Sequence, residues 1–91
     1  MPNFAQENSD TVEYNEGLGA YYVVAQNGLV LRDKPSRNGK KIATMPYNAE
    51  VEILDENGPE ETIGGKKAKW YKVKYKKYVG WAFGAYIELI D

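Results

Sequence analysis

Residues 70–82 read WYKVKYKKYVGWA, two aromatic-rich stretches joined by Lys76 and Lys77. In the first stretch, Tyr71, Val73 and Tyr75 alternate with Trp70, Lys72 and Lys74. This is the two-residue period of a β-strand with one face in water. Two polar residues between two such stretches predict a tight hairpin. The C-terminal half of the chain is therefore predicted to form antiparallel β-structure.

Shorter runs of the same kind fill the chain from residue 20 onward, and no stretch shows a convincing helical period. The predicted strands are residues 20–26, 28–32, 41–45, 50–54, 70–75, 78–82 and 87–90. The longest connection, residues 55–69, is predicted to be an extended arm or a small hairpin. Short strands in a flat sheet would expose their edges. We therefore expect an all-β fold in which about five to seven antiparallel strands close into a small SH3-like or OB-like barrel.

Alternation also assigns the faces of the strands. Val51 and Ile53 share one face and Glu50 and Glu52 the other, so the two apolar residues are predicted to point inward. The same rule, applied to the other strands, gives the predicted core: Val23, Leu29, Leu31, Ile42, Val51, Ile53, Val73, Val79 and Ile87.

The composition limits the chemistry that the protein can perform. The chain has 91 residues, of which 43% are hydrophobic, and contains neither cysteine nor histidine. Disulfides, thiolate or imidazole metal sites and histidine-based acid–base catalysis are therefore excluded. The acidic pairs Asp55–Glu56 and Glu60–Glu61 are expected to be solvated and are given no catalytic or calcium-binding role. We expect a non-enzymatic protein without a metal or cofactor.

The charges are divided unevenly along the chain. Residues 1–18 hold four acidic and no basic residues, whereas residues 19–91 hold all 12 basic residues against nine acidic ones. We predict a flexible acidic tail at residues 1–18 and one mildly basic domain at residues 19–91. No run is long and apolar enough for a membrane span, and residues 1–16 lack the basic and apolar regions of a signal peptide. The protein is therefore expected to be cytoplasmic or to have lost a leader.

Several of these runs together resemble the bacterial SH3 (SH3b) family. The resemblance covers residues 21 to 90 and rests on LVLR at residues 29–32 followed by Pro35, WYKV at residues 70–73, GW at residues 80–81 and AYI at residues 85–87. It implies a small β-barrel that binds rather than catalyses. It also implies a place in the bacterial cell envelope or periplasm, and a cell-wall peptide, a glycan or a protein as ligand.

Aromatic side chains are the candidates for the ligand groove. They combine a rigid apolar face with a polar tip, which suits sugars and peptides. Alternation and the family resemblance make Trp70 the first groove residue, followed by Tyr22, Tyr47, Trp81 and Tyr86. The alternative is that these rings only pack the ends of the barrel and shield strand edges.

A lysine-rich stripe supports a different hypothesis. Residues 66–77 hold seven lysines and no acid, and such a stripe could bind a polyanion through Lys72, Lys74, Lys76 and Lys77. The simpler interpretation is a solvated strand face that resists edge pairing. Arginine, the residue that reads bases, is absent from the stripe, which argues against nucleic acid. A third hypothesis is an adaptor that binds an extended peptide of a protein partner.

Overall fold

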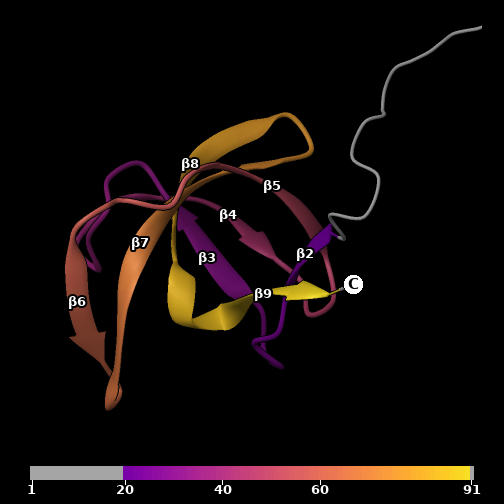
Figure 1. The fold of residues 1–91 in the computed structure, drawn as a ribbon. Helices are drawn as coiled ribbons and strands as arrows, with labels where there is room; N and C mark the ends of the chain where they lie inside the picture. The colour runs from indigo at the N-terminus through magenta and orange to yellow at the C-terminus, as the bar shows by residue number, and fades with distance from the viewer. Residues whose placement is uncertain (1–19, 91) are drawn as a thin grey trace, which may run out of the picture.

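The computed structural model describes residues 20–90, which form one antiparallel sheet of eight strands (Figure 1). A short 3-10 turn, η2 (Gly84–Tyr86), precedes the last strand. The strands are β2 (Ala20–Val23), β3 (Leu29–Arg32), β4 (Lys41–Met45), β5 (Glu50–Asp55), β6 (Glu60–Ile63), β7 (Lys66–Tyr75), β8 (Tyr78–Phe83) and β9 (Ile87–Ile90). The all-β prediction is confirmed. The predicted acidic tail, residues 1–18, lies outside the described residues.

The ten-residue strand β7 organises the sheet. The strand order is β4-β3-β8-β7-β5-β2-β9, and β6 pairs with β7 off this path. The C-terminal part of β7 pairs with β8 from Trp70↔Phe83 to Tyr75↔Tyr78, whereas its first four residues pair with β6. Figure 1 shows this β6–β7 hairpin at the left, away from β2 and β9 at the right. One strand thus connects the main sheet to a projecting arm.

The strand count and the closure of the sheet differ from the prediction. All seven predicted strands are present, and β6 is an eighth. It forms because Gly64 (φ 60°) and Gly65 (φ 82°) make a two-residue turn in the left-handed region, where glycine has no steric cost. Residues 55–69 therefore form the hairpin alternative. Among residues 20–90, the end strands β4 and β9 do not pair with each other, so the sheet is open and the expected barrel closure is not made by hydrogen bonds.

The predicted hairpin at Lys76 and Lys77 is confirmed, whereas β4 and β5, on either side of the Pro46 turn, pair with other strands. Lys76 (φ 54°) and Lys77 join β7 to β8, and the amide of Ala49 donates to the carbonyl of Pro46 (3.1 Å) in the turn before β5. Asn48 also has a positive φ of 72°, which asparagine tolerates better than most residues.

Most of the predicted core is buried. Val23, Leu29, Leu31, Val51, Val73 and Ile87 lie in one cluster, and Ile53 packs against it half-buried. The predictions for Ile42 and Val79 are wrong, because these side chains are 36% and 45% exposed. Since Leu31 pairs with Ala43 and Leu29 with Met45, Ala43 and Met45 face the core and Ile42 between them faces outward. Val79 likewise pairs with the exposed Lys74.

Four buried residues were not predicted to be in the core. Met45 and Ala82 belong to the main cluster and are fully buried. Trp70 and Phe83, only 2% and 4% exposed, lie outside that cluster and form a second buried group. The position of this second group determines where the candidate site lies.

Two substitutions on β4 test which of its side chains face the core. Met45→Ala is expected to lower the free energy of unfolding by about 2–5 kcal/mol, because it leaves a cavity at a fully buried position. Ile42→Ala, at an exposed position of the same strand, is expected to lower the free energy of unfolding by about 1 kcal/mol or less. Urea denaturation measures both. Equal losses for the two variants would contradict the observed register of β4.

Candidate functional site

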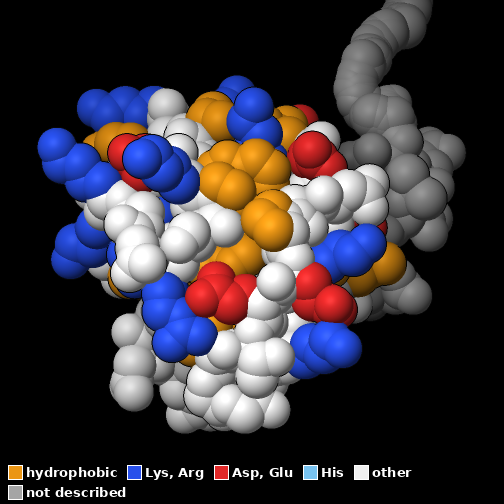
Figure 2. Space-filling view, turned by 90° about the vertical axis from the view of Figure 1, so that its left-hand side faces the viewer, with side chains coloured by type: hydrophobic (Ala, Val, Ile, Leu, Met, Phe, Trp, Pro, Cys, Tyr) orange, Lys and Arg blue, Asp and Glu red, His pale blue; other side chains and the backbone are white. Residues whose placement is uncertain are grey.

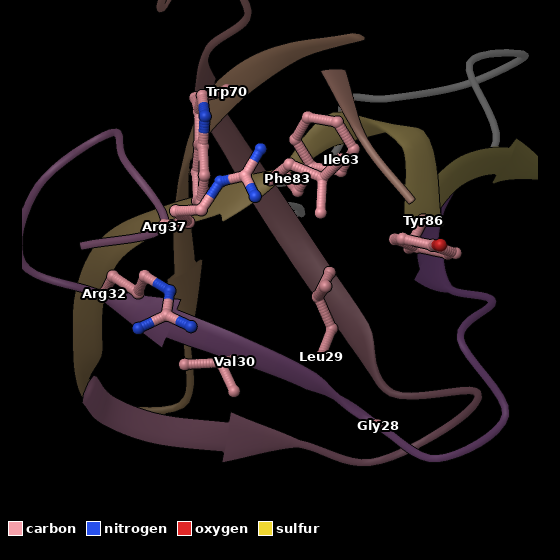
Figure 3. A pocket seen from close by; sticks show the side chains of 9 residues that line it. All are labelled: Gly28, Leu29, Val30, Arg32, Arg37, Ile63, Trp70, Phe83 and Tyr86. Carbon is pink, nitrogen blue, oxygen red and sulfur yellow. The ribbon is translucent and has the colours of Figure 1, made fainter. Parts of the chain in front are cut away.

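A pocket of about 250 Å³ lies between β3, the β6–β7 hairpin, β8 and η2 (Figure 3). Its apolar lining comes from aliphatic and aromatic side chains of these elements, and two arginines and the backbone at Gly28 complete it. The lining residues are Gly28, Leu29, Val30, Arg32, Arg37, Ile63, Trp70, Phe83 and Tyr86.

Three aromatic rings form a continuous row along the pocket. The ring centroids of Trp70 and Phe83 are 5.5 Å apart at 59°, and those of Phe83 and Tyr86 are 6.2 Å apart at 52°. Tilted pairs at these distances are favourable because ring edges face ring faces. Trp70 and Phe83 meet because they are direct cross-strand partners on β7 and β8. The row follows from the hairpin register.

One carboxylate holds the wall of the pocket together. The indole Nε1–H of Trp70 donates to Oε1 of Glu61 (2.9 Å), and Nε of Arg37 donates to Oε2 of the same group (2.8 Å). A second Arg37 nitrogen, Nη2, donates to the carbonyl oxygen of Thr62 (2.8 Å). We call these contacts the Glu61 clamp. It fixes the loop before β4 and strand β6 to the tryptophan of β7.

The clamp changes the acidity of its central group. The hydrogen bond from Arg37, and after it the hydrogen bond from Trp70, lowers the pKa of the Glu61 carboxyl below its usual value, although partial burial opposes the shift. Both bonds favour the charged form. The clamp is therefore strongest where Glu61 is ionised.

The backbone before β6 supports Trp70 from the other side. The amide of Gly58 donates to the carbonyl of Trp70 (3.0 Å), and the amide of Trp70 donates to the carbonyl of Pro59 (3.0 Å). A Cβ atom at Gly58 would collide with that carbonyl and would lie 2.7 Å from the Trp81 ring. Only glycine allows this close approach, so residues 58–59 can lie against β7 at Trp70.

A sequence profile of the bacterial SH3 domain family matches residues 27–88, which includes the whole pocket. The chain belongs to the bacterial SH3 domain family. The resemblance found in the sequence is thus confirmed, and membership of the family indicates a binding module. No curated protein matches the chain.

Two further findings concern the part of this SH3 domain that the structure describes. Residues 20–90 contain no cluster of three or more acidic side chains that could hold a metal ion. Over the same residues, no helix has the length and apolar character needed to cross a bilayer.

The pocket brings together two of the five predicted groove residues, Trp70 and Tyr86. Trp70 is more buried than expected and serves as a wall, whereas Tyr86 is half-buried. The other three predicted residues do not line the pocket. Trp81 packs near Gly58, Tyr47 is 53% exposed in the turn before β5, and Tyr22 pairs with Glu50 and Glu88.

The lysines of the stripe are dispersed and partly matched by acids. Lys74 lies directly opposite Glu52, and Lys72 opposite Asp55, on the neighbouring strand β5. Opposite charges at such positions attract across the sheet. Lys76 and Lys77 instead lie over the rings of Tyr75 (5.4 Å) and Tyr78 (5.5 Å). In Figure 2, Lys and Arg side chains lie mostly towards the edges of the face that carries the hairpin, around a central group of hydrophobic side chains.

The sequence analysis missed the charged groups and one aromatic ring of the site, namely Arg32, Arg37, Glu61 and Phe83. Arg37 and Glu61 are 24 positions apart in two polar segments, and no local pattern connects them. Glu61 was expected to be a solvated loop acid, which is wrong, because it accepts two side-chain hydrogen bonds. Phe83 could have been found, since extending the predicted hairpin by one residue places it opposite Trp70.

The clamp predicts a specific response to acid. Because the folded-state pKa of Glu61 is lowered, its contribution to stability is complete at neutral pH and is lost as the pH falls through that pKa. Between about pH 6 and about pH 3, wild type is therefore expected to lose more stability than Glu61→Gln, whose amide does not titrate. Urea midpoints at both pH values measure the difference.

Glu60→Gln is the matched control for this test. Its carboxylate lies one residue away and 3.8 Å from Nζ of Lys67, in an exposed pair that contributes little. Glu60→Gln should keep the acid sensitivity of wild type. An equal acid response of wild type and Glu61→Gln would contradict the role of the clamp.

Proposed function

We propose that this domain is a non-catalytic binding module of the bacterial cell envelope. Its ligand is a cell-wall peptide or glycan, or a segment of a protein partner. The observation that carries the proposal is the aromatic pocket of Trp70, Phe83 and Tyr86, which lies inside the segment that matches the family. An apolar pocket with a few polar groups is the usual form of a small-ligand site.

The size of the pocket limits what it holds. Ligand pockets usually measure about 300 to 1,000 Å³, and this one is smaller, at about 250 Å³. A ligand would therefore insert one side chain or one sugar ring and continue across the surface. The aromatic rings suit either group, since both present an apolar face. We also propose that the strands are arranged as a small SH3-like barrel, which would present such a pocket on a rigid support.

The rigidity of the wall supports binding. Trp70 is held by its indole nitrogen, by two backbone hydrogen bonds and by the ring of Phe83. A side chain that is already ordered loses little entropy when a ligand arrives. Preorganisation of this kind favours a binding role for a pocket that is otherwise small.

The arrangement of the lysine stripe gives less support to the alternative hypothesis, the binding of a polyanion. A polyanion would meet Lys72 and Lys74, but each faces an acidic residue across the strand pair. The local field is thereby reduced. Of the hypotheses from the sequence, a groove ligand is the one that the arrangement of side chains favours.

Co-sedimentation of the domain with intact peptidoglycan sacculi at low and high salt tests the wall-binding form of the proposal. Tyr86→Ala is the informative variant, because Tyr86 lines the pocket and is half-buried, whereas Trp70→Ala could unfold the domain. We expect binding that persists at high salt, and a loss of at least about tenfold in affinity for Tyr86→Ala.

Tyr47→Ala is the matched control, since this tyrosine is exposed and outside the pocket. It should bind as wild type does. Binding that disappears at high salt and in the Lys72→Glu, Lys74→Glu double variant would instead assign the activity to the stripe. If sacculi are not bound at all, the wall-binding form is wrong and a peptide ligand remains.

A further inference from the structure

The side chains that line the pocket form a cationic end and an apolar end, and Nζ of Lys66, which is not a lining residue, lies 5.0 Å from the centroid of the Tyr86 ring. Figure 3 shows the guanidinium groups of Arg32 and Arg37 on one side, and Leu29, Ile63 and Tyr86 on the other. The two arginines differ in their partners. Arg37 is neutralised by Glu61 at 2.8 Å, whereas within residues 20–90 no carboxylate is paired with Arg32. The net charge of this end is therefore set by Arg32.

Arg32 is held in place but keeps free donors. Its Nη1 donates to the carbonyl oxygen of Gly39 (2.8 Å) in a partly buried contact. A Cβ atom at Gly39 would lie 3.1 Å from Cβ of Arg32 and 2.8 Å from the carbonyl oxygen of Lys34, so the loop packs closely on the arginine stem. A guanidinium has five N–H donors, and this bond uses one of them. The remaining donors can bind an anion beside the pocket.

We propose that Arg32 binds a carboxylate of the ligand, and that the ligand is an extended peptide carrying this carboxylate next to an apolar side chain. The apolar side chain fills the space between Leu29, Ile63 and Tyr86, and the carboxylate meets Arg32. Charge complementarity favours an anionic group, and the planar guanidinium fits a carboxylate through two parallel hydrogen bonds. The inference rests on the proposed function, because it names the ligand of the same pocket.

The peptide chemistry follows from the proximity of the two ends. Both ends lie in one pocket of about 250 Å³, so one short ligand must supply both groups. Neighbouring residues of a peptide do so, whereas a neutral glycan would leave Arg32 unpaired. The carboxylate has two sources, an acidic side chain or a free C-terminus, and these are separated by experiment.

The first experiment is an array of synthetic hexapeptides that varies acidic, amide, basic and apolar residues at each position, with every peptide made both free and amidated at its C-terminus. Fluorescence polarisation measures binding to wild type and to Tyr86→Ala. The tightest peptides are expected to carry a carboxylate next to an apolar residue. Loss on amidation would identify the C-terminal carboxylate, and loss on changing Glu to Gln within the peptide would identify the side chain.

The second experiment links this preference to Arg32. For the best peptide, removing the carboxylate charge should weaken binding to wild type about tenfold. It should have almost no effect on Arg32→Gln, which loses the charge but keeps a donor for Gly39. Arg32→Lys should retain part of the preference, and its urea midpoint shows whether the fold is intact. Lys41→Gln, the register neighbour of Arg32 on β4, is the matched control and should behave as wild type does.

The outcomes separate the inference from the function on which it rests. If wild type binds peptides better than Tyr86→Ala but without preference for a carboxylate, the function stands and the role of Arg32 is wrong. If no peptide distinguishes wild type from Tyr86→Ala, the peptide-binding form of the function is wrong, and the inference with it. If the preference is undiminished in Arg32→Gln, another cation binds the carboxylate, which also overturns the inference.

Discussion

The pocket depends on the burial of the Trp70 side chain outside the main core. Its indole nitrogen is a strong donor, which is costly to bury unless an acceptor is present. The Glu61 carboxylate supplies the acceptor and is itself neutralised by Arg37. Glu61 lies on β6 and Arg37 in the loop before β4. The hydrogen bonds that satisfy the indole of Trp70 and the Glu61 carboxylate therefore bring this loop, β6 and β7 together. The same contacts set the wall against which Phe83 and Tyr86 align.

This arrangement explains why the site is small, polarised and rigid. Glu61 neutralises Arg37, whereas Arg32, the other arginine that lines the pocket, has no carboxylate partner among residues 20–90. Lys72 and Lys74 of β7 lie opposite acidic residues of β5. The specificity of the domain therefore depends on one end of the pocket. There the guanidinium of Arg32, held by the carbonyl oxygen of Gly39, can attract a ligand group over a short distance. Binding then needs little reorganisation of the protein.

Period-two alternation and turn chemistry were enough to predict seven of the eight strands, the hairpin at Lys76 and Lys77, and six of the ten buried hydrophobic residues. They failed at Ile42, because the face of β4 is set by its pairing with β3 and not by its own composition. They also failed at Glu61, since its partners come from distant parts of the chain. Trp70 was identified as a site residue, but its burial depends on β6, which the sequence offered only as part of one of two alternatives for residues 55–69. Tertiary contacts, not local patterns, built the site.

The most direct test of this account is the exchange of the Trp70 indole proton with solvent, measured by NMR on ¹⁵N-labelled domain. Trp81→Phe assigns the two indole signals. We predict that the Trp70 Nε1–H exchanges much more slowly than that of Trp81, and that Glu61→Ala removes this protection and shifts the signals of Phe83 and Tyr86 together. Fast exchange of the Trp70 indole in wild type, or full protection in Glu61→Ala, would contradict the claim that the clamp builds the pocket.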